Sequence, residues 1–324
     1  MNPILIGGCG SSGTTLLRVL LNAHPKIHCG TELNLFNNKI FYDEAFSYSR
    51  FDFKDLLSNR LVLFKYSLLQ YGYYFDDICK IAEDCNSFKT FVEQIIQSTL
   101  RKNKKSIWIE KSPSNCRYLK SFKDIFPDGK YIHVVRDGRD VVMSLVKRGW
   151  TPENAIRRWL YDTMCGVPLR GDKKYMEVKY EDLVTNPSVI LRNLHQFLDV
   201  EIIDFDSLEV SNEFSGEYKK TWTFSPINNI SDQGISKWHK MELRSRRKME
   251  RLFKFIYLSK KVQDELKMDS EINGNYALKL FGYDYEYKWN CNRTIDLNVI
   301  YLWIRSLISN MIKIKSSAWT LKIM

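Results

Sequence analysis

A glycine-rich turn carries the clearest chemical signal in this sequence of 324 residues. Residues 8–15 read GCGSSGTT and lie between a short apolar run at 3–7 and a leucine-rich segment at 14–22. Glycines allow close backbone approach and positive φ, and a helix that begins directly after them presents unpaired N–H groups and the positive end of its dipole. The turn therefore predicts an anion-binding loop between a strand and a helix, and a plain structural turn is the alternative.

The spacing of Gly8 and Gly13 matches a nucleotide-binding phosphate loop, but Thr14 stands where the lysine of such a loop belongs. That lysine reaches the β- and γ-phosphates, so its absence leaves γ-phosphoryl transfer poorly supported. We therefore expect the loop to hold an anion other than a nucleoside triphosphate.

Short apolar segments alternate with helical segments along the chain, which is typical of a parallel sheet wound with helices. We predict an α/β fold with a P-loop-like parallel β-sheet flanked by helices. Strands are expected at 3–7, 26–29, 106–110, 130–135 and 175–178. Helices are expected at 14–22, from the turn at 136–138 to about 147, from past Pro187 to 197, and at 237–260.

The domain organisation follows from the same pattern. An aromatic-rich, mostly helical insertion at about 34–105 is expected to cap the carboxyl ends of the strands, where open α/β sheets bind ligands. We predict one domain over residues 1–290 and a separate basic helical tail over 291–324.

The composition excludes a disordered chain, because 44% of the residues are apolar. The formal net charge is +11, and most of the surplus lies in the segments 237–254 and 297–324. A basic protein favours anionic partners such as a nucleotide, an acidic substrate or an anionic membrane. We predict no nucleic-acid partner.

The pattern of residues 297–324, which contain no acidic residue, predicts an amphipathic helix. Its apolar positions recur at helical spacing, and they are Val299, Ile300, Ile304, Leu307, Ile308, Met311 and Ile312. This face either packs on the domain, which we favour, or rests on an anionic membrane.

The seven cysteines are scattered and form no C-x-x-C pair, and no Cys/His cluster occurs. We therefore expect no metal site and no disulfide framework. No signal peptide fits before residue 3, and no stretch reaches the roughly 20 apolar residues of a membrane span. Reduced thiols favour a cytoplasmic location, with membrane association through the tail left open.

The run at 6–32, IGGCGSSGTTLLRVLLNAHPKIHCGTE, resembles the sulfotransferases that use 3′-phosphoadenosine-5′-phosphosulfate (PAPS). It is most like tyrosylprotein sulfotransferases and related bacterial enzymes. Four more blocks agree in order, and they are EKSP at 110–113, VVRDGRDVVMS at 134–144, KYEDL at 179–183 and GISKW at 234–238.

The resemblance implies a set of PAPS-binding residues. It assigns the 5′-phosphosulfate to Ser12, Gly13, Thr14 and Thr15, the 3′-phosphate to Arg136 and Ser144, and further nucleotide contacts to Tyr180 and Lys237. An arginine at a strand end can fork onto a phosphate. Each of three residues also has a purely structural alternative. Arg136 could form a surface salt bridge, Tyr180 could be a packed aromatic ring, and Lys237 could belong to a basic helix face.

The resemblance also implies two catalytic residues, Glu32 and Lys111. In sulfuryl transfer to a hydroxyl the acceptor must lose its proton, and Glu32 matches the family carboxylate that takes it. Lys111 matches the lysine that supports charge on the leaving phosphate oxygen. Glu110 and Asp137 are the next candidates for the base. The mechanism requires no metal.

The chain departs from the family pattern at three places. Ser11 replaces a usual arginine next to the phosphosulfate, and Thr31 replaces the first acid of the motif around Glu32. Leu33 and Asn34 replace polar and basic residues that follow the carboxylate in the tyrosine-modifying enzymes, which argues against tyrosine as the acceptor. A peptide tyrosine, a glycan hydroxyl and a lipid hydroxyl therefore all stay open as acceptors. A small-molecule kinase on the same fold and a non-catalytic anion- or membrane-binding relative are the competing functions.

Overall fold

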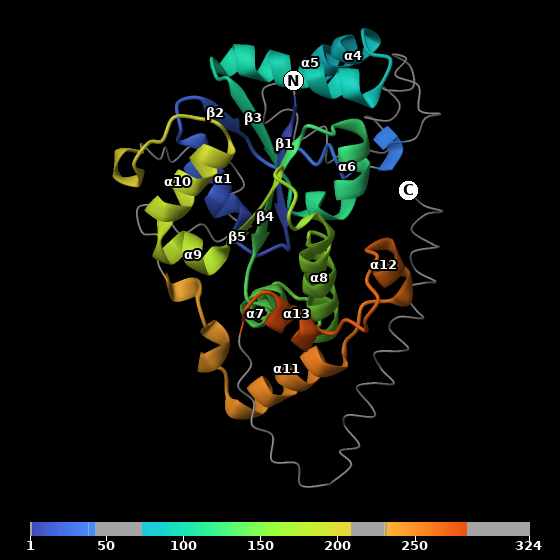
Figure 1. The fold of residues 1–324 in the computed structure, drawn as a ribbon, viewed down its shortest axis with the longest axis vertical. Coiled ribbons are helices and arrows are strands. Elements are labelled where there is room, and N and C mark those ends of the chain that lie inside the picture. Colours follow the sequence, from blue (N-terminus) through green and yellow to red (C-terminus); the bar gives the residue numbers. More distant parts are fainter. Residues whose placement is uncertain (1, 38, 43–72, 209–229, 231, 284–324) are drawn as a thin grey trace. The chain divides into compact units, whose positions relative to one another are not determined.

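The structure is a computed structural model that describes residues 2–37, 39–42, 73–208, 230 and 232–283 (Figure 1). The chain divides into two compact units. The first contains Met1–Arg136 and Leu169–Gln233, and the second contains Asp137–Pro168 and Gly234–Met324. The single domain expected over 1–290 stays a prediction, and the tail expected over 291–324 lies outside the described residues.

A parallel sheet of five strands forms the centre of the first unit. Its strands are β1 (Ile4–Gly8), β2 (Ile27–Cys29), β3 (Ile107–Lys111), β4 (Lys130–Val135) and β5 (Tyr175–Lys179). Their spatial order is β2-β3-β1-β4-β5. In the register of the sheet, Ile6 of β1 pairs with Lys111 of β3 on one side and with Ile132 of β4 on the other. The predicted strands and the P-loop-like α/β fold are therefore confirmed.

One face of the sheet is covered by α1 (Thr14–Asn22) and α10 (Pro187–Phe197). β1 is apolar and buried along its whole length, as is typical of a central parallel strand with helices on both faces of the sheet. Ile6, Ile132 and Val178 meet Leu17 and Leu194 in this buried core.

Aromatic side chains pack over part of the opposite face, around Phe36. Its ring lies 5.5 Å from that of Phe122, 5.7 Å from that of Phe88 and 6.4 Å from that of Trp108. These rings join β3 to α5 (Phe88–Asn103) and α6 (Leu119–Ile125). Between β3 and α6, the short helix η3 (Pro113–Tyr118) packs on β1.

The described helices of the predicted insertion, α4 (Phe75–Glu83) and α5, do not lie at the carboxyl ends of the strands. α5 lies instead at the end of the sheet where β1 and β3 begin (Figure 1), and its Ile96 and Leu100 line a hollow together with Ile4 and Ile107. The rest of the predicted insertion, residues 43–72, lies outside the described part of the chain.

The second unit is helical where it is described. Its main elements are α7 (Gly138–Lys147), α8 (Pro152–Met164), η9 (Lys237–Lys240), α11 (Leu243–Phe255), α12 (Lys260–Glu265) and α13 (Gly274–Leu280). Thr151 caps α8, because its Oγ1 accepts from the backbone N–H of Asn154 at 3.3 Å. The rings of Trp159 and Phe253 lie 5.4 Å apart and join α8 to α11.

The basic segment predicted as one helix over 237–260 is broken after η9. The backbone of Met241 is extended, with φ −68° and ψ 148°, and α11 begins two residues later. The reason lies in Trp238, which is buried and whose backbone N–H donates to Asp140 Oδ1 at 2.9 Å. Docking this residue on α7 prevents the chain from continuing as one helix.

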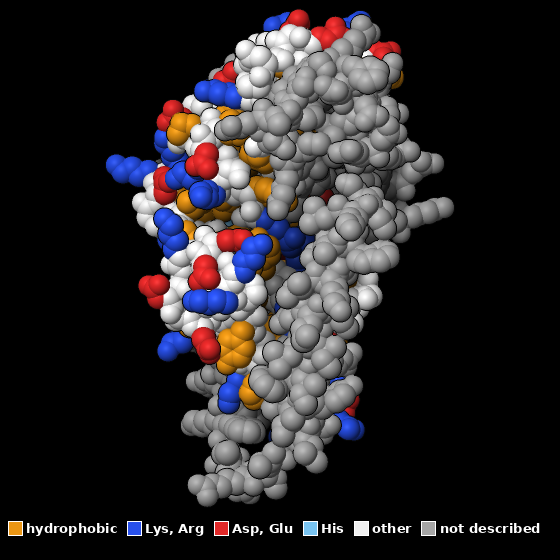
Figure 2. Space-filling model, turned by 90° about the vertical axis from the view of Figure 1, so that its right-hand side faces the viewer, with side chains coloured by type: hydrophobic (Ala, Val, Ile, Leu, Met, Phe, Trp, Pro, Cys, Tyr) orange, Lys and Arg blue, Asp and Glu red, His pale blue; other side chains and the backbone are white. Residues whose placement is uncertain are grey.

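Basic and acidic side chains are interspersed over the described surface of the face drawn in Figure 2. None of the helices that the structure describes is long and apolar enough to cross a membrane. The predicted amphipathic segment at 297–324 lies outside the described residues.

Two histidines of the first unit are held in their neutral form. Burial, together with Lys105 and Arg18, lowers the pKa of His28 to about 4. Burial lowers the pKa of His195 as well, and the ring of His24, 4.9 Å away, adds to this effect. Protonation of either histidine therefore favours unfolding.

We predict an acid-sensitive stability that comes from His28 and His195. Above about pH 7.5 both histidines are neutral in the folded and in the unfolded chain, so neither changes the free energy of unfolding. As the pH falls from about 6.5 to 4, the unfolded chain binds protons first, so the free energy of unfolding should drop by roughly 1–3 kcal/mol. Urea titrations at several pH values should show that the free energy of unfolding depends less on pH in the His28→Asn/His195→Asn variant than in the wild type. Parallel curves would contradict the prediction.

Candidate active site

The glycine-rich loop turns sharply between β1 and α1. Ser11 and Gly13 have left-handed φ values of 74° and 93°, and Ser12 N–H donates to the Cys9 carbonyl at 3.1 Å. Ser12 is only 1% exposed. The hydroxyls of Ser11 and Ser12 are buried and make no hydrogen bond to any residue that the structure describes. Buried hydroxyls normally have partners, so this loop has the donors of an anion-binding cradle.

The first turn of α1 adds backbone donors to the loop. Gly13 occupies the N-cap position and Thr14, buried to 3% exposure, begins the helix. No side chain among the described residues caps this end. The N–H groups of a first turn have no partner within their own helix, and together with the helix dipole they favour an anion.

Arg136 and Tyr180 hold the loop from the side of β4 and β5. Arg136 Nη1 donates to the Ser11 carbonyl at 2.6 Å, and its guanidinium lies 4.2 Å from the centre of the Tyr180 ring. The same ring contacts Gly13, where an added Cβ would come within 2.4 Å of Tyr180 Cδ2. The loop therefore depends on a glycine at position 13.

An ion pair joins the ends of β2 and β3 beside the loop. Lys111 Nζ lies 2.6 Å from Glu32 Oε1 and 3.4 Å from Thr15 Oγ1. The Lys111 side chain is 3% exposed, whereas that of Glu32 is 34% exposed. The pair thus places a buried cation and a solvent-accessible carboxylate next to the start of α1.

Glu110 is fully buried, and its carboxylate is committed to hydrogen bonds. Its Oε1 accepts from the backbone N–H groups of Leu33 and Asn34, each at 3.1 Å, and from Ser112 Oγ at 2.5 Å. Its Oε2 accepts from Asn115 Nδ2. Burial raises the pKa of Glu110, and these four donors oppose the rise. Glu110 is therefore not the accessible base that the sequence left as the next candidate.

The predicted site residues of the first unit come together at one edge of the sheet, and all five strands contribute. The loop follows β1, Glu32 lies three residues beyond β2, Lys111 ends β3, Arg136 follows β4 and Tyr180 follows β5. Parallel strands end at the same edge, and ligands of open α/β sheets bind there. The roles that the resemblance gives to these residues stay predictions.

Two predicted residues, Ser144 and Lys237, belong to the second unit. Ser144 is half-buried in α7, and Lys237 is exposed in η9. Their proposed roles toward the nucleotide also stay predictions.

A stacked ion pair organises α7 and η9. The Arg139 guanidinium pairs with Asp137 at 2.6 Å and lies 3.9 Å from the centre of the Trp238 ring. Asp137 also caps α7 by accepting from the Arg139 N–H at 2.9 Å. Asp137, the other alternative candidate for the general base, therefore caps α7 and pairs with Arg139.

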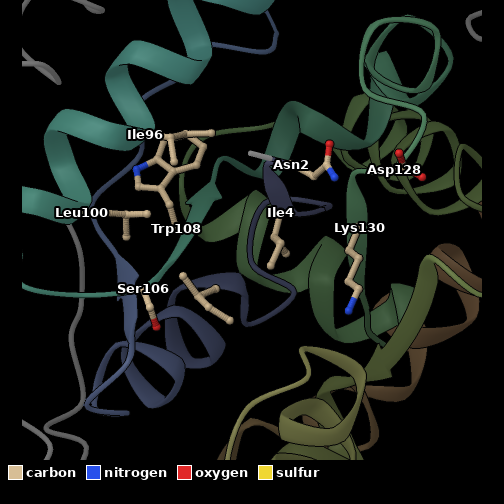
Figure 3. A pocket seen from close by; sticks show the side chains of 9 residues that line it. Asn2, Ile4, Ile96, Leu100, Ser106, Trp108, Asp128 and Lys130 are labelled. Atoms are coloured by element: carbon tan, nitrogen blue, oxygen red, sulfur yellow. The ribbon is translucent and has the colours of Figure 1, made fainter.

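A hollow of about 270 Å³ lies elsewhere, against the beginnings of β1, β3 and β4 (Figure 3). Ile4, Trp108 and Lys130 contribute to its lining. Because it is at the amino ends of the strands, it is separate from the loop and the Glu32–Lys111 pair.

The arrangement at the carboxyl edge fits transfer of an anionic group. It combines an anion cradle, a buried cation and a carboxylate that solvent reaches, and these are the parts needed to hold an anion and accept a proton. No group of three or more His, Cys, Asp or Glu side chains that could hold a metal occurs within the described ranges. The fold and this site define an α/β protein with a P-loop-like anion site.

The chain belongs to the sulfotransferase family, whose family model matches residues 3–204. The matched segment includes the glycine-rich loop, Glu32, Lys111, Arg136 and Tyr180. The resemblance seen in the sequence is therefore confirmed.

Curated relatives are protein-tyrosine sulfotransferases. Protein-tyrosine sulfotransferase A of Caenorhabditis elegans is 26% identical over 208 residues, which cover 61% of this chain and 50% of that protein. Protein-tyrosine sulfotransferase 1 of Danio rerio is 28% identical over 211 residues, which cover 62% of this chain and 54% of that protein. The matches span about half the length of these two relatives.

Solved structures with the same fold include the sulfotransferase domain from the curacin biosynthetic pathway. It superposes with a TM-score of 0.53 at 20% identity and covers 83% of this chain and 99% of that domain. The sulfotransferase domain from the olefin synthase of Synechococcus PCC 7002 has a TM-score of 0.49 at 22% identity and covers 94% of each chain. The curacin domain supports the fold alone.

Sequence reasoning missed how Glu110, Ser112 and Asn115 are used. A signal was present, because Glu110 is an acid that follows the apolar residues Ile107–Ile109 of the strand and is followed closely by two side chains that can donate hydrogen bonds. That pattern predicts a buried, hydrogen-bonded carboxylate.

We predict that Gly13→Ala lowers the free energy of unfolding by roughly 2–4 kcal/mol, because the new Cβ meets Tyr180 and the backbone φ is left-handed. Gly10→Ala is the matched control within the same loop. No atom lies within 4 Å of its added Cβ, so its change should stay within about 0.5 kcal/mol. Urea unfolding of both variants measures the difference, and equal stabilities would show that the ring of Tyr180 does not constrain position 13.

Proposed function

We propose that this protein transfers the sulfuryl group of PAPS to the hydroxyl of a protein tyrosine. The observation that carries the proposal is the Glu32–Lys111 pair, joined at 2.6 Å beside a loop whose two buried serine hydroxyls have no hydrogen-bond partner among the described residues. The names of the curated relatives support tyrosine as the acceptor over a glycan or a lipid.

The residues present fit PAPS as the donor. When bound, PAPS supplies a sulfuryl group, and its transfer leaves adenosine 3′,5′-bisphosphate. We propose that Ser12, Gly13, Thr14 and Thr15 hold the 5′-phosphosulfate through their N–H groups and hydroxyls, because the buried Ser12 hydroxyl lies directly before a helix start. Arg136, Ser144, Tyr180 and Lys237 complete the proposed nucleotide site.

Arg136 contacts the loop at position 11, where this chain departs from the family. The family usually carries an arginine there, but this chain has Ser11. Arg136 Nη1 reaches the Ser11 carbonyl at 2.6 Å and so brings a guanidinium to the same part of the loop. A guanidinium carries five N–H donors and matches phosphate geometry, which suits Arg136 to the 3′-phosphate.

Glu32 is the proposed general base. Its carboxylate is accessible, and the ion pair with Lys111 orients it beside the loop. The acceptor hydroxyl gives its proton to Glu32, which ends the charge attraction between Glu32 and Lys111. The Lys111 cation, 3.4 Å from Thr15 Oγ1, then stabilises negative charge at the loop.

The donor and the acceptor class can be tested directly. PAPS should raise the melting temperature of the protein, whereas ATP with Mg²⁺ should not, because a ligand stabilises the state that binds it. Radiolabelled PAPS offered with tyrosine peptides, glycans and lipids should label the peptides. Stabilisation by ATP alone would favour the kinase alternative, and label on a glycan or lipid would overturn the tyrosine assignment.

We expect Arg136→Ala to weaken PAPS binding by about 10- to 150-fold, because a charge-assisted contact contributes roughly 1.5–3 kcal/mol. The variant should also lose the preference for PAPS over adenosine 5′-phosphosulfate, which has no 3′-phosphate. Calorimetric titration of both ligands measures this ratio. A variant that keeps the wild-type preference would exclude Arg136 as the 3′-phosphate ligand.

Glu32→Gln keeps the size of the side chain but removes its basicity. It should bind PAPS normally and slow sulfation by about 10²- to 10⁴-fold. A phenol ionises near pH 10, so the variant's rate should recover with rising pH if tyrosine is the acceptor. Single-turnover sulfation at several pH values measures this, and retention of more than about a tenth of the wild-type rate would rule out Glu32 as the base.

A further inference from the structure

The chain directly after Glu32 is held by a buried carboxylate of β3. Glu110 is fully buried, and its Oε1 accepts from the N–H groups of Leu33 and Asn34 at 3.1 Å each. Asn34 has a left-handed φ of 57°, a conformation that asparagine adopts more readily than most residues other than glycine. The two hydrogen bonds to Glu110 fix the backbone that leads away from Glu32.

Two side chains extend this contact to neighbouring segments. Ser112 Oγ donates to Glu110 Oε1 at 2.5 Å and accepts from the Asn34 N–H at 3.0 Å. Asn115 Nδ2 donates to Glu110 Oε2 and, at 3.2 Å, to the carbonyl of Ile6 in β1. Glu110 therefore links the segment after Glu32 to the strand that leads into the glycine-rich loop.

A carboxylate suits this place better than any other side chain. Its two oxygens offer about four acceptor sites, and four donors point at them. An apolar residue would leave the N–H groups of Leu33 and Asn34 without this acceptor, and a buried donor without a partner is costly.

We propose that Glu110 is a positioning residue for sulfuryl transfer, which holds the segment after Glu32 so that the Glu32 carboxylate meets Lys111 beside the loop. The proposal rests on the proposed function, in which Glu32 is the base. Successive side chains of a strand point to opposite faces, so Lys111 and Glu110 hold the Glu32 segment at two separate points.

Glu110→Gln tests the proposal, because it keeps the shape but replaces one acceptor oxygen with a donor. We expect kcat to fall by about 10²-fold, the size of effect that a small misplacement of a reacting group causes. KM for PAPS should change less than about threefold, because the hydrogen bonds of Glu110 to described residues go to Leu33, Asn34, Ser112 and Asn115 and not to Ser12–Thr15. Glu177→Gln, in β5 and paired with Arg170, is the control and should keep wild-type activity.

A double-mutant cycle separates positioning from a structural role. If Glu110 acts through Glu32, adding Glu110→Gln to Glu32→Gln should lower the rate by less than about threefold further. An equal loss in both backgrounds would overturn the proposal. A small loss of sulfation rate in the Glu32→Gln single variant would instead show that Glu32 is not the base. Failure of the Glu110 proposal can thus be told apart from failure of the proposed function.

Ser112→Ala provides a second route if Glu110→Gln does not fold, as judged by circular dichroism. It removes one donor to Glu110 and one acceptor from Asn34 but leaves the carboxylate in place. A fall in kcat of several-fold with KM for PAPS unchanged, absent in the Glu32→Gln background, would support the proposal. An unchanged kcat, or an equal loss in both backgrounds, would overturn it.

Discussion

β1 is hydrogen-bonded to a parallel strand on each side, β3 on one and β4 on the other. The loop that follows it therefore emerges in the middle of the carboxyl edge, where the ends of all five strands meet. The chain leaves β1 toward β2 and leaves β4 toward β5, so the connections diverge between these neighbours. Ligands of open α/β sheets bind at such a divergence, and Ser11 and Arg136 meet at this point.

Buried charge is the second constraint on the site. Lys111 and Glu110 are adjacent in β3, and both are almost completely buried. A buried charge is costly unless it is paired or hydrogen-bonded, and each residue meets this condition through the segment at 32–34. Lys111 pairs with Glu32, and Glu110 accepts from the two residues after it. The same contacts that make these charges tolerable therefore fix the carboxylate proposed as the base.

Much of this site could be predicted from the sequence, because its residues follow recognisable strands. The apolar runs predicted the strands, and each strand end carries a polar residue or turn that the family resemblance marked. Strand order could not be read in this way, since it depends on packing between distant segments. The hydrogen bonds of Glu110 were also hidden, because they join residues more than 75 positions apart.

The basic segment after Ser236 shows how tertiary contacts override a local pattern. Its composition and spacing favour one continuous helix, yet Trp238 is buried beside Arg139 and its backbone N–H donates to Asp140. The chain therefore ends η9 early and begins α11 after an extended residue. Burial of the indole and the stacked guanidinium supply more free energy than a few additional helical hydrogen bonds, each of which contributes about 1 kcal/mol. Lys237 precedes this anchor by one residue, so its backbone is fixed while its side chain stays exposed.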